Sequence, residues 1–125
     1  MAYELHIERP AGQISLAEWC SAVQGTEGVR LATQDAVVVN PATREEIRIP
    51  RAEGDAEVLQ ESGGFLGLGR KQQWARAFRF THGRASFRAS ASIESPADSV
   101  HRAAVLLAAS LGAKVVGDEG ETYEW

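Results

Sequence analysis

The sequence predicts one α+β domain, with a mostly antiparallel sheet of about five to seven strands and two helices packed on one of its faces. Short runs that alternate apolar and polar residues predict the strands, and two longer runs with helical spacing predict the helices. The length of 125 residues suits one modest hydrophobic core. Because no long linker interrupts these elements, residues 1–125 are expected to form a single domain.

The first two predicted elements are a strand and a short helix. Tyr3, Leu5 and Ile7 alternate with charged or polar residues, which is typical of a half-buried strand. Ser15 followed by Glu18 is a capping-box pattern and predicts the start of a helix. Gly25 is placed to end this helix, whose buried stripe is expected to consist of Leu16, Trp19, Cys20 and Val23.

The middle of the chain predicts several short strands. Val29 and Leu31 indicate a brief strand, and residues 36–50 predict a β-hairpin that turns after Asn40-Pro41. Val58 and Leu59 indicate another short strand. The glycines of residues 63–69 predict a mobile hairpin loop.

Two longer strands and a second helix are predicted after this loop. Trp74, Phe78 and Phe80 share one parity on the first strand, and a turn at His82-Gly83 leads into the second. The second strand is expected to point inward at every other residue from Ala85 to Ile93.

The second helix is predicted to begin with Ser95 as its cap and Pro96 in its first turn, and to end at Gly112. Its spacing places His101 on the polar side. Residues 113–116 predict a last strand. The buried stripe is expected to comprise Val100, Ala103, Ala104, Leu107 and Leu111.

Composition excludes several classes of protein. The longest apolar run is Ala103 to Ala109, far short of the roughly 20 residues that span a bilayer. The N-terminus is charged from its fourth residue and carries no secretory signal, so a cytoplasmic location is expected. A single cysteine, Cys20, excludes an internal disulfide framework and a cysteine-based zinc cage.

No motif in the sequence indicates catalysis, a metal or a cofactor. His6, His82 and His101 lack the spacing of metal ligands, and no nucleophile elbow or paired carboxylates stand out. We therefore expect no enzyme activity, no metal and no cofactor. An alternative remains open, in which the Gly-rich residues 63–71 serve a small ligand-binding or enzymatic domain. Arg70 follows the last glycine and Gln72 takes the Ser/Thr place, which departs from a phosphate-binding loop.

A second alternative is nucleic-acid binding through the arginine-rich strands. Six of the 13 basic residues lie between Arg70 and Arg88, among aromatic residues. However, Phe87 has the opposite parity to Arg84 and Arg88, and the net charge of −4 disfavours phosphate contacts. We therefore expect no nucleic-acid partner.

Acidic residues are concentrated in two places, residues 45–61 and residues 118–124. The second group lies in a tail that is either a frayed, solubilising terminus or a binding edge for a basic partner. On the second interpretation, carboxylates attract the partner and aromatic side chains anchor it. The candidate partner-binding residues are Asp118, Glu119, Glu121, Tyr123 and Trp125, with Glu53 and Asp55 as a second patch.

Most of the chain, apart from the Gly-rich middle, resembles a loose group of small bacterial proteins. The resemblance comprises the Tyr-Glu-Leu strand at residues 3–5, Ile-Ser-Leu-Ala-Glu-Trp at 14–19, the valine strand into Asn-Pro at 37–41, Glu-Glu-Ile-Arg-Ile-Pro at 45–50 and the segment from Leu111 to Glu121. These proteins are similar to immunity partners encoded beside polymorphic or contact-dependent toxins. The resemblance implies a noncatalytic, cytoplasmic protein that neutralises a cognate toxin by occluding its active site.

Overall fold

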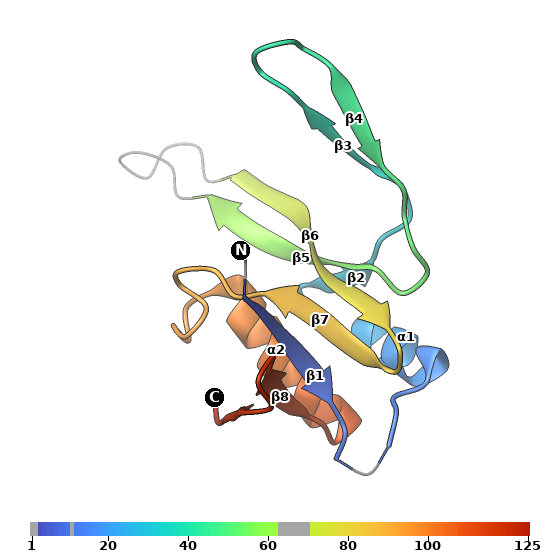
Figure 1. Ribbon diagram of the computed structural model, residues 1–125, viewed down its shortest axis with the longest axis vertical. Coiled ribbons are helices and arrows are strands. Elements are labelled where there is room, and N and C mark those ends of the chain that lie inside the picture. The colour runs from blue at the N-terminus through green and yellow to red at the C-terminus, as the bar shows by residue number, and fades with distance from the viewer. Residues whose placement is uncertain (1–2, 11, 63–70) are drawn as a thin grey trace.

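The computed structural model describes residues 3–10, 12–62 and 71–125. Seven strands form one antiparallel sheet, two further strands form a separate hairpin, and two helices complete the fold (Figure 1). The predicted α+β class is therefore confirmed. The elements are β1 (Glu4–Glu8), α1 (Leu16–Gln24), β2 (Val29–Leu31), β3 (Ala36–Val39), β4 (Glu46–Ile49), β5 (Ala56–Ser62), β6 (Lys71–Thr81), β7 (Arg84–Arg88), α2 (Ser99–Leu111), β8 (Lys114–Gly117) and β9 (Thr122–Tyr123).

The sheet has the strand order β2-β5-β6-β7-β1-β8-β9. The N-terminal strand β1 lies inside it, paired with β7 on one side and with β8 on the other. Leu5 and Ile7 of β1 are almost fully buried, so their alternation with polar residues gives the strand one core face and one outer face. The N-terminal strand β1 therefore lies next to the C-terminal strands β8 and β9, which form one edge of the sheet.

Side chains of the sheet and of both helices form the core, and α2 lies behind β1 and β7 in Figure 1. The helices contact each other, and α2 also contacts β1, β5 and β8. Three aromatic rings lie at the centre of the core. The ring centre of Phe78 is 5.8 Å from that of Trp19 of α1 and 5.3 Å from that of Phe87 of the sheet. Within the described residues, no helix is long and apolar enough to cross a membrane.

The first helix begins as predicted. Ser15 Oγ accepts a hydrogen bond from the Glu18 amide, and the Glu18 carboxylate accepts one from the Ser15 amide, so the capping box is complete. Gly25 ends the helix. Cys20, which was expected in the buried stripe, is half-buried at its edge.

The second helix begins three residues later than the sequence predicts. Asp98, not Ser95, is the N-cap: its Oδ1 accepts hydrogen bonds from the amides of Val100 and His101. Residues 95–98 instead form a turn, in which the Asp98 amide donates to the Ser95 carbonyl. The Asp98 carboxylate satisfies two amides of the first turn and interacts favourably with the helix dipole. Gly112 ends the helix in the left-handed conformation, at φ 62°.

A β-bulge changes which residues of β6 face the core. Ala56 of β5 is opposite Phe78, but the next residue of β5 is opposite Arg76, so Ala77 is an extra residue in β6. Beyond the bulge, Ala75 lies opposite the buried Val58. The expectation that Trp74, Phe78 and Phe80 share a face is therefore wrong. Trp74 lies on the outer face, where the Arg30 guanidinium is 4.2 Å from the centre of its ring.

Strand β7 is shorter than predicted. It ends at Arg88, whereas the alternation suggested inward-facing residues as far as Ile93. Turns follow instead, with the Ile93 amide donating to the Ser90 carbonyl. Ile93 is still buried, because the chain must come back over the core before α2 begins. Apolar spacing therefore identified a buried residue but not its secondary structure.

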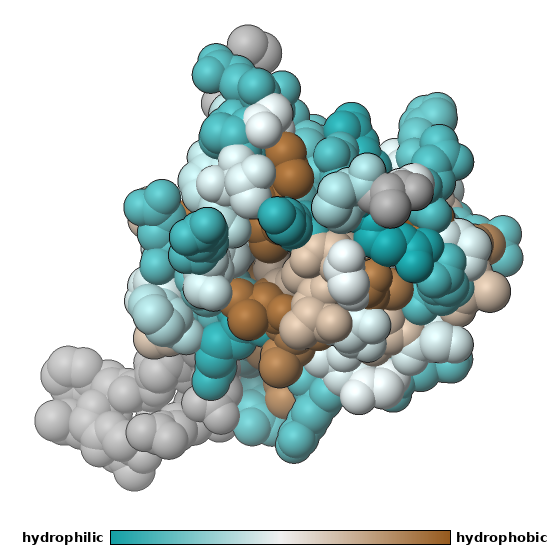
Figure 2. Space-filling model, turned by 90° about the horizontal axis from the view of Figure 1, so that it is seen from below, coloured by the Kyte–Doolittle hydropathy of each residue, from teal (hydrophilic) through white to brown (hydrophobic). Residues whose placement is uncertain are grey.

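The β3–β4 hairpin is confirmed, and it stands away from the main sheet (Figure 1). Its turn is held by the Asn40 side chain, which accepts from the Ala42 amide. Both strands expose apolar side chains: Val37, Val39, Ile47 and Ile49 are each about half exposed, at 51%, 53%, 55% and 46%. Viewed from the end opposite the hairpin, the surface is mostly hydrophilic, with apolar side chains gathered near its centre (Figure 2).

Candidate functional site

A cleft opens where strands β6 and β7 diverge. The two strands pair only near their connecting turn, where Arg79, Phe80 and Thr81 lie opposite Ser86, Ala85 and Arg84. Farther along, β6 pairs with β5 alone and β7 pairs with β1 alone. The cleft has a volume of about 1020 Å³. Residues 71–78 of β6 consequently have one strand edge without a partner strand in the described part of the chain.

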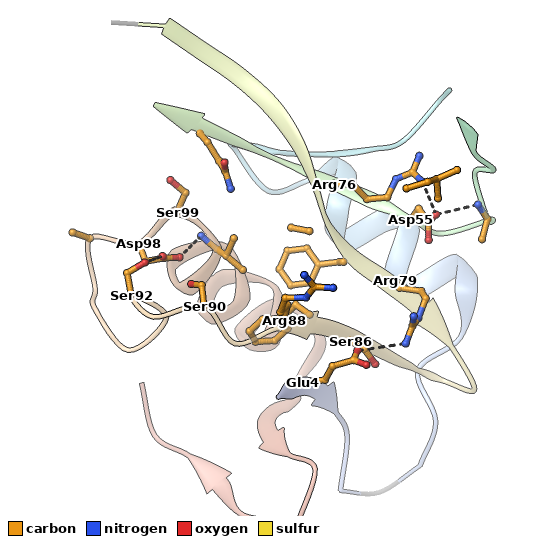
Figure 3. Close-up of a pocket in the computed structure, with 18 of the residues that line it drawn as sticks. Glu4, Asp55, Arg76, Arg79, Ser86, Arg88, Ser90, Ser92, Asp98 and Ser99 are labelled. Carbon is orange, nitrogen blue, oxygen red and sulfur yellow. Dashed lines mark hydrogen bonds and ion pairs between the residues drawn. The ribbon is translucent and has the colours of Figure 1, made fainter. Parts of the chain in front are cut away.

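Side chains from several strands, from the end of the hairpin and from the region around the start of α2 line the cleft (Figure 3). Phe78 and Phe87 form its apolar floor, with their ring centres 5.3 Å apart. Three arginines lie on the strands beside it. The loop before α2 and the start of that helix contribute Ser90, Ser92, Asp98 and Ser99, and the end of the hairpin contributes Ile49 and Pro50.

The three arginines differ in how far their charge is paired. Arg79 Nη2 is 3.4 Å from a carboxylate oxygen of Glu4, in an exposed pair. Arg76 Nη1 is 3.6 Å from Asp55 Oδ2, and its Nη2 donates to the Gln34 carbonyl. Arg88 is exposed and, among the described residues, forms no ion pair or side-chain hydrogen bond. The cleft therefore contains one guanidinium that is free to bind an anionic group.

Asp55 and Arg76 each have one buried polar atom without a hydrogen-bond partner among the described residues. Asp55 is 6% exposed, and its Oδ2 accepts a hydrogen bond from the Ala52 amide. Its Oδ1 is buried and has no hydrogen-bond partner within the described residues, and the same holds for Arg76 Nε. A buried acceptor and a buried donor without partners are costly, and a bound group that both donates and accepts would satisfy them.

The acidic tail is ordered and packed, not frayed. Strand β9 pairs with β8, and the described residues continue to Trp125. The Glu121 carboxylate accepts hydrogen bonds from the hydroxyls of Tyr3 and Tyr123. Burial, followed by the nearby Glu121 carboxylate, raises the pKa of Tyr123, so its hydroxyl stays protonated. Glu121 and Tyr123 thus hold the tail against the first strand.

Asp118 is also used within the fold. Its Oδ1 is 2.7 Å from His6 Nε2, and its Oδ2 accepts from the Glu4 amide. The hydrogen bond from His6 and then that from Glu4 lower the pKa of Asp118. Of the tail carboxylates among the candidates, Glu119 alone is exposed without a hydrogen bond or ion pair in the described structure.

Trp125 packs against the core and stacks on His101 of α2. The two rings are stacked with their centres 4.1 Å apart, and Trp125 is also 6.1 Å from the ring of Phe87. His101 is 5% exposed, and its Nδ1 is 2.7 Å from the Ile93 carbonyl. The expectation that His101 lies on the polar side of the helix is therefore wrong. The last residue of the chain covers it, which helical spacing alone does not reveal.

The structure does not bring the two acidic patches together. Strands β6, β7 and β1 separate β5, which follows Asp55, from β8 and β9 of the tail. Asp55 is buried at the cleft, and Glu53 is exposed in the turn before it. The sequence therefore identified one residue of the cleft, Asp55. It considered the arginine-rich strands only as a nucleic-acid alternative and named none of the three cleft arginines as a candidate site residue.

Two other expectations concern ligands. The Gly-rich residues 63–70 lie outside the described residues, so the small-ligand alternative that rests on them stays a prediction. In the part of the chain that the structure describes, no three His, Cys, Asp or Glu side chains gather in a way that could hold a metal ion.

No family model matches the chain, and no match is found among the curated proteins or among the solved structures.

Proposed function

We propose that this protein is a noncatalytic binding protein, and specifically an immunity protein that acts in the cytoplasm by covering the active site of a cognate bacterial toxin. One observation carries the proposal: the β3–β4 hairpin stands apart from the sheet and exposes four large apolar side chains. The resemblance of the sequence to toxin immunity partners supplies the class of partner.

The hairpin is poorly explained as a structural element of an isolated protein. A two-stranded hairpin is at best marginally stable in water. Its strands have only four residues each and bury none of their described large side chains. Transferring a large aliphatic side chain from water to an apolar interface contributes roughly 1.5–3 kcal/mol when burial is complete. A protein partner would therefore stabilise the hairpin while the hairpin binds it.

Both faces of the hairpin offer contacts to a partner. Val37 lies opposite Arg48, and Val39 lies opposite Glu46, while Ile47 and Ile49 alternate with these charged residues. Apolar side chains next to charged ones are typical of a protein interface with an apolar centre and a polar rim. Outside the hairpin, the one other exposed large hydrophobic residue among the described residues is Leu106 of α2.

The experiment is co-expression of the tagged protein with the products of the neighbouring reading frames, followed by purification. The test variant is Ile47→Thr/Ile49→Thr, which keeps β-branched residues but removes apolar surface. Leu106→Gln is the matched control, because it removes an equally exposed side chain elsewhere. We expect wild type and L106Q to retain one stoichiometric partner and the hairpin variant to lose it.

A growth assay tests the immunity role itself. We expect the partner to arrest growth when it is expressed alone, and co-expression of wild type to restore growth. A partner retained equally by the hairpin variant would remove the hairpin from the interface. A retained partner that leaves growth unaffected, or the absence of any partner, would overturn the immunity function.

A further inference from the structure

We infer that the cleft between β6 and β7 receives an extended, acidic segment of the protein partner, which adds to the free edge of β6 as a new strand. The inference rests on the proposed function, because it describes how the same partner is held.

Most of β6 has an edge without a partner strand in the described part of the chain. This strand has 11 residues, yet only its last three pair with β7. Residues 71–78 would offer an edge of roughly 25 Å, at about 3.3 Å per residue. An exposed strand edge presents amide and carbonyl groups that pair readily with an extended segment. Here the edge lies within the strand order of the sheet, so an added strand would fill the gap between two existing strands.

Two buried polar atoms at the cleft lack partners. Asp55 Oδ1 lacks a donor and Arg76 Nε lacks an acceptor within the described structure, and both residues line the cleft. An amide side chain of the segment, such as that of Gln, supplies what both atoms lack, because its NH2 group donates and its carbonyl oxygen accepts. Either a simple anion or a simple cation would satisfy one of these atoms and leave the other unpaired.

The charges that line the cleft favour an acidic segment. Asp98 caps α2 and Asp55 contacts Arg76, so these two carboxylates are already engaged. Arg88 is the cleft guanidinium without such a partner in the described residues. A carboxylate is the natural partner of a free guanidinium, because the two groups can form two parallel hydrogen bonds. A segment with an acidic side chain facing β7 would therefore fit.

A nucleic-acid strand fits the same cleft less well. Glu4, Asp55 and Asp98 line it together with the arginines, so a chain of closely spaced phosphates would meet three carboxylates. An extended peptide can place one acidic residue at Arg88 and neutral residues elsewhere. The mixed charge of the lining thus favours a peptide.

The end of the β3–β4 hairpin connects this cleft with the proposed interface. Ile49 and Pro50, at the end of β4, form part of the cleft lining, and Ile49 is also one of the exposed apolar residues of the hairpin. A partner that binds the hairpin would therefore also lie next to the cleft.

Synthetic peptides test the inference on the full chain. The probe, called the Glu-Val peptide, is a capped peptide about eight residues long with a single central Glu among alternating Val and Thr residues. The charge control, called the Lys-Val peptide, has Lys in place of that Glu. Two further peptides carry N-methyl groups on alternate residues, one in each phase, which removes the main-chain donors. Binding is followed by the amide NMR signals of the protein.

We expect the Glu-Val peptide to shift the amides of residues 71–78 and 87–88 and to slow their hydrogen exchange. We expect both the Lys-Val peptide and the Arg88→Glu variant to weaken binding at least about tenfold. Arg84→Glu is the matched control: Arg84 is an exposed arginine on the same strand, but it pairs with Glu8 and lies outside the cleft lining. It should leave the affinity unchanged.

Several results would overturn the inference. Equal binding of both N-methylated peptides would exclude strand addition, and unchanged affinity in R88E would exclude the acidic contact. Binding of a single-stranded oligonucleotide at the cleft in preference to all peptides would assign it to nucleic acid. Protection of residues 71–78 in a dimer of the protein alone would make a second copy the occupant.

The purified complex separates this inference from the proposed function. If the partner is lost from the I47T/I49T variant but binds R88E as tightly as wild type, the proposed function stands and the cleft assignment fails. If no partner exists and the Glu-Val peptide still binds the cleft, the peptide site stands without the immunity function.

Discussion

His6 of the first strand and Asp118 of the turn after β8 form a hydrogen bond of 2.7 Å between Nε2 and Oδ1. His6 Nδ1 is 2.8 Å from Ser86 Oγ, so one ring joins β1 to β7 and to the turn after β8. An ionised carboxylate only accepts hydrogen bonds, and Nε2 therefore carries a proton. The contact links the beginning of the chain to its acidic tail, and it engages a carboxylate that the sequence suggested for a partner.

This contact predicts how stability depends on pH. The pKa of Asp118 in the folded protein lies below its ordinary value of 3.8, mainly because of the hydrogen bond from His6. The stabilisation is therefore fully present above pH 3.8 and is lost as the pH falls through the lower, folded-state pKa. We expect Asp118→Asn to unfold at a lower urea concentration than wild type at pH 7, with the difference shrinking below pH 3.8. Glu119→Gln is the control, and a constant difference at every pH would contradict the prediction.

Glu18 predicts a second pH effect, at the start of α1. Hydrogen bonds from Arg9 and then from Ser15 lower its pKa from 4.5 to about 2. Its contribution to folding is present above pH 4.5 and disappears as the pH falls through about 2. Glu18→Gln should lower the melting temperature at pH 7, and thermal scans should show this gap closing between pH 4.5 and pH 2. Glu27→Gln, at an exposed position without a partner among the described residues, should show no such gap.

Trp125 is predicted to stabilise the fold although it is the last residue. Its ring stacks on His101 and contacts Phe87 and Tyr123, so Trp125→Ala would remove three ring contacts and uncover part of the core. We expect a loss of about 2 kcal/mol in the free energy of unfolding, measured with urea. Glu124→Ala, at the preceding exposed residue, should change it by less than about 0.5 kcal/mol. If both variants match wild type, the tail does not stabilise the core.

Two glycines allow backbone strain to be separated from steric overlap. Gly54 has φ +91°, and a Cβ there would lie 2.9 Å from Phe80 Cβ, whereas Gly112 has φ +62° with nothing within 4 Å of such an atom. The Gly54 carbonyl also accepts a hydrogen bond from Trp19 Nε1. Gly112→Ala should cost about 1 kcal/mol for the left-handed backbone, and Gly54→Ala about 2–4 kcal/mol. Equal losses in the free energy of unfolding, measured by urea titration, would show that the side chains around Gly54 move aside at no cost.

Local signals in the sequence determined much of the fold. The capping box at Ser15 and Glu18, the hairpin around Asn40 and the helix end at Gly112 were all predicted, because each depends on residues within a few positions of one another. The α+β class followed from the same local periods.

The predictions for Trp74 and His101 were wrong because contacts between residues distant in the sequence decide where these side chains lie. The bulge in β6 depends on its register with β5, and it moves Trp74 away from the face of Phe78. His101 is buried because Trp125 comes back over it from the end of the chain. Neither event leaves a periodic pattern in the sequence, since each depends on where another segment lies in space.

The candidate site shows the same division. The sequence by itself determined that the chain has a concentration of arginines after residue 70, two groups of acidic residues and a hairpin of β-branched residues. Only the tertiary structure decided that Asp118 and Glu121 hold the tail in place, and that Arg76 and Arg88 face one cleft with Asp55. The physical reason is that side-chain chemistry is local, whereas pairing and burial depend on strand order and on the point at which β6 and β7 separate.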